Sequence, residues 1–193
     1  MILNLITLST VKLQIGVSST EYDAGLTAII PIVSNDVRRI LNYNYDKSVV
    51  SLFESGQTTI DFGVSGNAYY EPFYHTMSLP FPLGQVVYHP NIPEDTYLSA
   101  YNNDNGVYTL SQAATGNGDY VFPSVQISQW PAIAKMCWYK LSAQTTTDAE
   151  KRNVQSISYG PVSKTFADSE INQRWNYPQT LINELGTPYA HTG

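Results

Sequence analysis

The stretch TEYDAGLTAIIPIVSNDVRRILNY, residues 20–43, decides the predicted fold because its apolar residues recur at helical spacing. Seven of them form one stripe: Leu26, Ile29, Ile30, Val33, Val37, Ile40 and Leu41. Thr20 followed by Asp23 resembles a capping box at the start of this stripe. Pro31 removes a backbone donor, so we expect a kink there. The pattern predicts a long helix over residues 20–45.

Three further helices are predicted from caps and apolar spacing, over residues 9–16, 128–142 and 168–185. The last one begins at an Asp168 cap. Pro178 cannot continue a helix freely, so we expect it to split this element into two short helices.

The pattern changes to a strand-like period between residues 49 and 126. Short runs rich in β-branched and aromatic residues predict strands within 55–63, 84–90, 95–101, 106–111 and 119–123. The loop NNDNG predicts a tight hairpin turn, because Asn, Asp and Gly tolerate positive φ. We therefore predict an α+β protein: a mainly helical bundle of about four helices (1–48 and 127–193) with an inserted β-rich subdomain (49–126).

The amino-acid composition argues against nucleic-acid binding. The 193 residues carry a net charge of -6, and the 10 Lys and Arg residues form no basic cluster. Charged residues make up only 13% of the chain, whereas 15 Tyr residues are present. Such a balance suits surface that becomes buried in protein interfaces. An ordinary β-rich domain with exposed Tyr explains the composition equally well.

The N-terminal apolar run is short and lacks a basic leader, so we expect no signal peptide, no membrane span and synthesis in the cytosol. The single Cys137 lies in the apolar context KMCWYK. This context predicts a small buried side chain, and a reactive thiol with a distant His partner is the alternative.

No motif in the chain predicts chemistry. His75, His89 and His191 have no neighbouring ligand at metal-binding spacing, so neither a metal nor another cofactor is expected. The segment GVSG lacks the spacing of a nucleophile elbow, and YNNDNG lacks the acidic residues of a calcium loop. We expect a protein that is not an enzyme, and keep a hydrolase only as a third hypothesis.

The order of the predicted elements along the chain is more informative than any single element. LSTVKLQIGV followed by TEYDAGLTAIIPIVSNDVRRILNY resembles the opening of the head-tail connector (adaptor, or head-completion) family of tailed bacteriophages. VQSISYGPVSKTFAD followed by INQRWNYPQTLINELGTPY resembles the closing part of that family. The stretch GQVVYHPNIPEDTYLSAYNNDNGVYTLSQAATGNGD is similar to a hairpin phrase of phage structural proteins, although the insertion is longer and more β-rich than in compact connectors.

The resemblance implies a structural virion protein at the head-tail interface. It implies a homo-oligomeric ring, usually of about twelve copies, built from one repeated heterologous contact. Such a ring docks under the portal protein, meets tail or neck proteins (stopper, terminator or nozzle), and lets DNA pass through its lumen without specific binding. The C-terminal segment is expected to act as a docking arm for the portal.

Eight residues of that segment are the predicted partner contacts: Tyr159, Pro161, Trp175, Tyr177, Leu181, Ile182, Leu185 and Tyr189. For four of them, packing in the core of the protomer is an equal alternative: Trp175, Leu181, Ile182 and Leu185. The second hypothesis is a virion β-module that binds a carbohydrate or receptor through the Tyr-rich insertion. Its candidate residues are Tyr69, Tyr70, Tyr74 and Tyr101.

Overall fold

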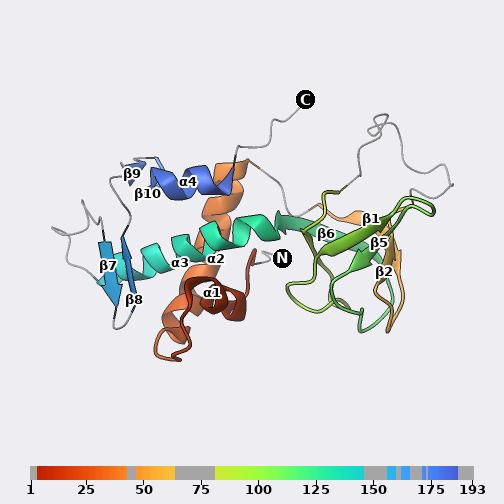
Figure 1. The fold of residues 1–193 in the computed structure, drawn as a ribbon, viewed down its shortest axis with the longest axis horizontal. Helices are drawn as coiled ribbons and strands as arrows, with labels where there is room; N and C mark the ends of the chain where they lie inside the picture. Colours follow the sequence, from red (N-terminus) through yellow and green to blue (C-terminus); the bar gives the residue numbers. More distant parts are fainter. Residues whose placement is uncertain are drawn as a thin grey trace. The chain divides into compact units, whose positions relative to one another are not determined.

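The computed structural model describes residues 4–42, 47–63, 81–145, 156–159, 162–165, 171–172 and 174–186. The chain forms two compact units (Figure 1). The helical unit comprises residues 1–44 and 129–193, and the β unit comprises residues 45–128. The boundaries expected from the sequence lie within a few residues of these.

The predicted fold class was wrong. The chain is a mixed α/β protein with four α-helices and a nearly closed six-stranded antiparallel sheet in its described part, and not a mainly helical bundle. Two physical reasons account for the error. The final predicted helix is largely replaced by strand and turn, and the β-rich segment has a hydrophobic core of its own.

The helical unit contains α1 (Leu8–Ile15), α2 (Asp23–Leu41), α3 (Trp130–Thr145) and α4 (Gln179–Leu185). Thr7 caps α1, because its side chain accepts a hydrogen bond from the Thr10 amide at 3.2 Å. Gly16, with φ of 74°, ends α1 in the left-handed region that favours glycine.

The apolar stripe of α2 is confirmed, since all seven of its predicted members are buried. The helix runs continuously through Pro31. The predicted capping box is wrong: Tyr22 is the N-cap without a side-chain bond, and the Asp23 carboxylate instead pairs with Lys12 at 2.7 Å. This ion pair ties the start of α2 to α1.

Helix α3 lies at the centre of the helical unit and contacts α1, α2 and α4 (Figure 1). Its middle is buried on nearly every side, which is typical of a core helix. The buried residues are Ala132, Ile133, Ala134, Met136, Cys137, Trp138 and Tyr139. Gly25 of α2 allows a close approach, because a Cβ there would lie 2.6 Å from Cδ1 of Leu141.

The C-terminal elements are β7 (Ser156–Tyr159), β8 (Val162–Thr165), β9 (Ile171–Asn172) and β10 (Tyr177–Pro178). β7 pairs with β8 and β9 pairs with β10, both antiparallel. The predicted helix over 168–185 was therefore wrong at the described residues before 179, which are 171–172 and 174–178. Asn176 has φ of 62°, which a helix cannot accommodate, and Pro178 is extended with ψ of 133°. The predicted Asp168 cap lies outside the described residues.

The β unit contains β1 (Val49–Phe53), β2 (Thr59–Asp61), β3 (Gln85–Tyr88), β4 (Leu98–Asn102), β5 (Val107–Leu110) and β6 (Gly118–Gln126). They form one antiparallel sheet in the order β3-β6-β1-β2-β5-β4. The two end strands approach each other at the bridge between Val86 and Tyr97, where the Val87 amide donates to the Thr96 carbonyl at 3.0 Å. This contact nearly closes the sheet into a barrel.

Five strands were predicted in this unit and all five are present, whereas β1 was missed and β6 is longer than expected. The NNDNG hairpin is confirmed, since it joins the paired strands β4 and β5 and Gly106 has φ of 72°. The apolar interior includes Phe53, Phe62 and Tyr108. Phe62 meets Tyr108 edge to face, with ring centroids 5.4 Å apart.

Candidate functional site

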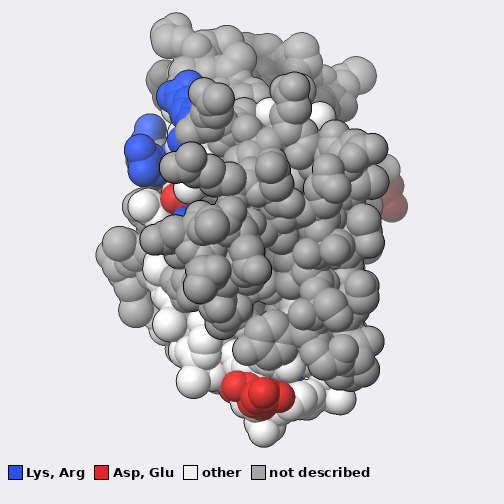
Figure 2. All heavy atoms as spheres, turned by 90° about the vertical axis from the view of Figure 1, so that its left-hand side faces the viewer, with Lys and Arg blue, Asp and Glu red and all other residues white. Residues whose placement is uncertain are grey.

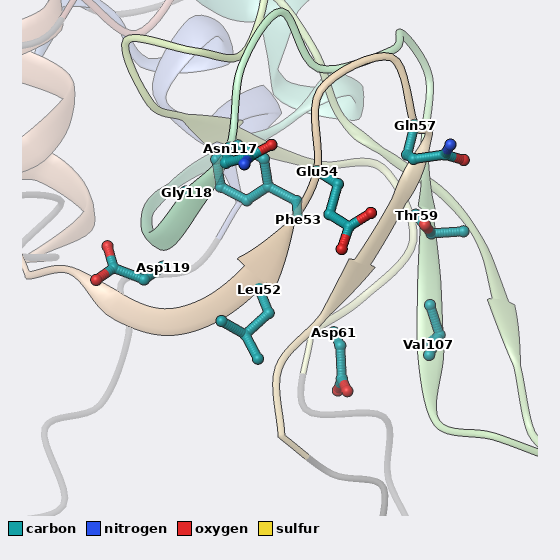
Figure 3. A pocket seen from close by; sticks show the side chains of 10 residues that line it. All are labelled: Leu52, Phe53, Glu54, Gln57, Thr59, Asp61, Val107, Asn117, Gly118 and Asp119. Carbon is teal, nitrogen blue, oxygen red and sulfur yellow. The ribbon is translucent and has the colours of Figure 1, made fainter.

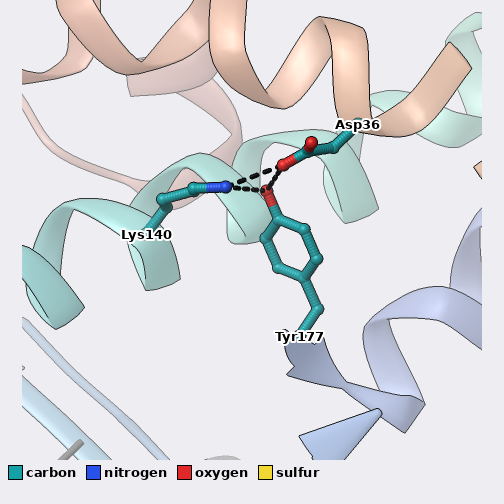
Figure 4. A network of polar contacts seen from close by, with 3 residues as sticks. All are labelled: Asp36, Lys140 and Tyr177. Carbon is teal, nitrogen blue, oxygen red and sulfur yellow. Dashed lines mark hydrogen bonds and ion pairs between the residues drawn. The ribbon is translucent and has the colours of Figure 1, made fainter. Parts of the chain in front are cut away.

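A polar cluster of Asp36, Lys140 and Tyr177 holds the C-terminal segment, residues 174–186, on the helical unit (Figure 4). The Tyr177 hydroxyl donates to Asp36 Oδ2 at 2.7 Å, and Lys140 Nζ donates to the same oxygen at 2.7 Å. Lys140 Nζ also lies 3.3 Å from the Tyr177 hydroxyl and 5.1 Å from its ring centroid. These three residues, which we call the tyrosine clamp, join α2, α3 and β10.

The tyrosine clamp keeps its phenol protonated. Tyr177 is fully buried, and burial raises the pKa of its hydroxyl. The hydrogen bond to Asp36 and the charge of that carboxylate raise the pKa further. The phenol is therefore a hydrogen-bond donor at physiological pH, and the cluster acts as an anchor rather than as a site of proton transfer.

A second contact lies two residues earlier, at Trp175. The guanidinium carbons of Arg39 and Arg174 lie 5.7 and 4.8 Å from the centroid of the Trp175 ring, within the range of cation-π interaction. Both arginines are exposed and Trp175 is half-buried. We call these three residues the Arg-Trp platform. Figure 2 shows Lys and Arg side chains of the described residues gathered toward one edge of the molecule.

The platform and the clamp share one face of α2. Asp36 and Arg39 are three residues apart in the helix, so their side chains lie on the same side. Asp36 receives Tyr177 and Arg39 receives Trp175. The position of the indole is thus fixed by two neighbouring attachments.

The structure separates the predicted partner contacts into groups. Tyr177, Leu181 and Leu185 are 0–1% exposed and belong to the core of the helical unit, whereas Trp175 and Ile182 are half-buried. The backbone of Tyr159 lies in β7, and Pro161 and Tyr189 lie outside the described residues. Only the half-buried pair is therefore accessible among those whose side chains are described, and a role in partner binding stays a prediction.

The outer face of the β unit carries a groove of about 790 Å³ across β6, β1, β2 and β5 (Figure 3). Its lining comprises Leu52, Phe53, Glu54, Gln57, Thr59, Asp61, Val107, Asn117, Gly118 and Asp119. Three of these residues are acidic, and we call this site the acidic groove. Leu52 is directly opposite Asp61 in the pairing of β1 with β2, and it is 63% exposed.

An exposed apolar pair continues this face. Val50 is 66% exposed, and its cross-strand partner Tyr120 is 36% exposed. Beneath them, His89 contacts Phe53 and Tyr120 at centroid distances of 5.0 and 4.7 Å. Burial lowers the pKa of His89, and the charge of Asp119 acts in the opposite direction. The rings of His89, Phe53 and Tyr120 thus form a packed aromatic cluster.

Charge is divided unevenly between the two units. The β unit has eight Asp and Glu residues and one basic residue, Lys47, which is a net charge of -7. The helical unit has nine Lys and Arg and eight Asp and Glu residues, which is a net charge of +1. The acidity of the chain therefore belongs to the β unit.

Sequence reasoning missed the tyrosine clamp, Arg39 and the acids of the groove. The spacing of Asp36 and Arg39 on one helix was a visible signal, but their partners lie far along the chain. Of the four tyrosines proposed to bind a carbohydrate or receptor, only Tyr101 lies among the described residues. It is half-buried and packs on Tyr108, with centroids 4.6 Å apart.

The expected burial of Cys137 is confirmed, since it is 0% exposed and burial raises its pKa from 9.0 to about 12. Across the described ranges, no group of three or more His, Cys, Asp or Glu residues is arranged to hold a metal ion. Within the same ranges, none of the helices combines the length and apolarity that crossing a membrane requires.

Comparison with known proteins found no match among protein-family models, curated proteins or solved structures.

Proposed function

We propose that this chain is a structural protein of a tailed-phage virion, and that its copies form a ring joining the portal to the tail or neck. The observation that carries the proposal is that each copy presents two unlike exposed surfaces, the Arg-Trp platform and the acidic groove. A closed ring needs one heterologous contact between two different patches of every subunit. A two-fold dimer needs only one self-complementary patch, so two unlike surfaces favour the ring.

The ordered resemblance of both chain ends to head-tail connectors supports the same conclusion. The two ends are parts of one folded unit, because the C-terminal segment packs on α2 and α3 through the tyrosine clamp. In this proposal both units contribute to the ring, the helical unit through the Arg-Trp platform and the β unit through the acidic groove. The net charge of -6 suits a channel through which DNA passes without being held.

The location of the protein in virions tests the proposal. We expect mass spectrometry of purified particles to find about a dozen copies, and labelled antibody or image reconstruction to place them between head and tail. Particles made without the protein should contain filled heads that lack tails. A copy number typical of tail fibres, or absence from particles, would contradict the connector role.

A second candidate is a β-module that binds a carbohydrate or receptor, and the groove on the β unit is the observation that favours it. Aromatic rings usually supply the stacking surface for sugars, and Phe53, the aromatic residue of the groove lining, is only 4% exposed. A glycan array with the full chain tests this candidate. Binding that is lost on Leu52→Ala, without loss of particle assembly, would favour it over the connector.

A further inference from the structure

We propose that neighbouring copies associate head to tail, with the Arg-Trp platform of one copy docked in the acidic groove of the next. This inference deepens the proposed function and rests on it for the ring. It names the two faces that meet, and therefore the occupant of the groove: a second copy of the same chain.

The groove calls for an occupant that is both cationic and apolar. Glu54 and Asp119 are exposed and Asp61 is half-exposed, so three carboxylates border the space. Exposed Leu52 offers an apolar contact between them. The β unit has a single basic residue in its sequence, so its own charges do little to neutralise this face. An acidic or purely apolar partner would remove the exposed Glu54 and Asp119 carboxylates from water without supplying a cation for them.

The platform has the complementary chemistry. The exposed guanidinium groups of Arg39 and Arg174 are suited to pairing with carboxylates, and the half-buried Trp175 ring adds apolar contact area. Arg and Trp are also the residue types that most often dominate binding energy at protein interfaces. The tyrosine clamp fixes the chain two residues from Trp175, so the backbone at Trp175 loses little conformational entropy when the platform binds.

The location of the two faces explains why the association propagates. The platform belongs to the helical unit and the groove belongs to the β unit. The two faces share no residue, so docking of the platform of one copy does not use up the groove residues of that copy. Repetition of one such contact gives a ring when the rotation closes.

Isosteric neutral variants of the full-length chain test this contact. The groove variant is Glu54→Gln with Asp119→Asn, and the platform variant is Arg39→Gln with Arg174→Gln. Sedimentation velocity and mass photometry would measure association over a range of concentrations at low and high salt. We expect the wild-type chain to associate, each variant to dissociate at concentrations at least tenfold higher, and salt to weaken the wild-type assembly.

Mixing the two variants tests directly whether the platform of one copy binds the groove of another. The groove variant retains an intact platform, and the platform variant retains an intact groove. An equimolar mixture should therefore form a one-to-one heterodimer that grows no further. A matched control, Glu94→Gln with Asp104→Asn, neutralises two exposed acids of the β unit outside the groove and should assemble like the wild type.

Each other outcome overturns the inference. Variants that assemble like the wild type would exclude these faces as the contact, and a mixture that stays monomeric would exclude their pairing. A wild-type chain that stays monomeric at all concentrations would exclude association through the platform and the groove. The copy number and position in virions are measured separately, so the connector role can survive any of these results.

Discussion

Tyr177 donates a hydrogen bond of 2.7 Å to Asp36, a residue 141 positions earlier in the sequence. This bond fastens the C-terminal segment to α2. Replacing Tyr177 with Phe should lower the free energy of unfolding of the helical unit by about 1–3 kcal/mol, because the partly buried Asp36 carboxylate loses one of its two donors. All three Trp residues of the chain lie in the helical unit, so urea unfolding followed by Trp fluorescence measures this unit selectively.

A double-mutant cycle with Asp36→Ala, which removes the acceptor, separates the hydrogen bond from general packing effects. The coupling energy between the two substitutions should be clearly favourable. Tyr120→Phe, which alters an exposed tyrosine of the β unit, serves as the control and should leave the Trp transition unchanged. A Tyr177→Phe variant as stable as the wild type would show that the clamp does not anchor the segment.

The stability of the helical unit should fall at alkaline pH because of Cys137. Its pKa is raised by burial from 9.0 to about 12, so the unfolded thiol ionises at lower pH than the folded one. The contribution is fully present below pH 9 and is lost as the pH rises toward 12. Tyr177, whose pKa is raised from 10.0, adds to the loss above that pH.

Urea unfolding at intervals between pH 8 and pH 10 measures the Cys137 contribution before tyrosine ionisation dominates. We expect stability to decline in the wild type and to be nearly constant in Cys137→Ala, although the variant is less stable throughout. Equal slopes in the two proteins would assign the decline to other groups. Ellman's reagent should label the folded wild type only as fast as the helical unit opens.

Gly118 should not tolerate a side chain. A Cβ at this position would lie 2.2 Å from Cζ of Phe53, a ring that is itself only 4% exposed and cannot move aside freely. Gly118→Ala should destabilise the β unit by about 1–3 kcal/mol through overpacking. Hydrogen exchange of β1 and β6 measures the effect, and the Trp transition of the helical unit should stay unchanged. Unaltered exchange would show that the sheet relaxes at no cost.

Leu181 and Ile182 are adjacent residues with different exposure, which makes them a matched pair. Leu181 is 1% exposed, whereas Ile182 is half-buried. Leu181→Ala should cost about 2–4 kcal/mol of stability, and Ile182→Ala about 1 kcal/mol or less. If Ile182 is a partner contact, its substitution should weaken particle assembly while the monomer stays folded. A larger loss of stability for Ile182 would assign both residues to the core.

The local parts of the fold were predictable because they depend on short-range patterns. The apolar stripe of α2 follows the helical period, and the NNDNG turn follows from residues that tolerate positive φ. β1 escaped prediction because Val50 and Leu52 point apolar side chains outward, which removes the usual alternation of polar and apolar residues. The predicted helix over 168–185 failed where Asn176 adopts a left-handed conformation that helical spacing does not reveal.

The candidate site was much less predictable than the fold. The tyrosine clamp joins residues from three separate elements, and the acids of the groove come from β2, β6 and the turn after β1. No local spacing relates such residues, because antiparallel pairing and helix packing bring them together only in the folded chain. The sequence alone does show the excess of acidic residues between 45 and 128. The structure adds that those residues form one unit.

The β unit enters the chain through β1 and leaves it through β6, and these two strands are paired, with Val49 opposite Val121. The first and last strands of the unit are therefore neighbours within one sheet. Because its first and last strands pair with each other, the sheet of the β unit is completed by its own residues and needs no strand from the helical unit.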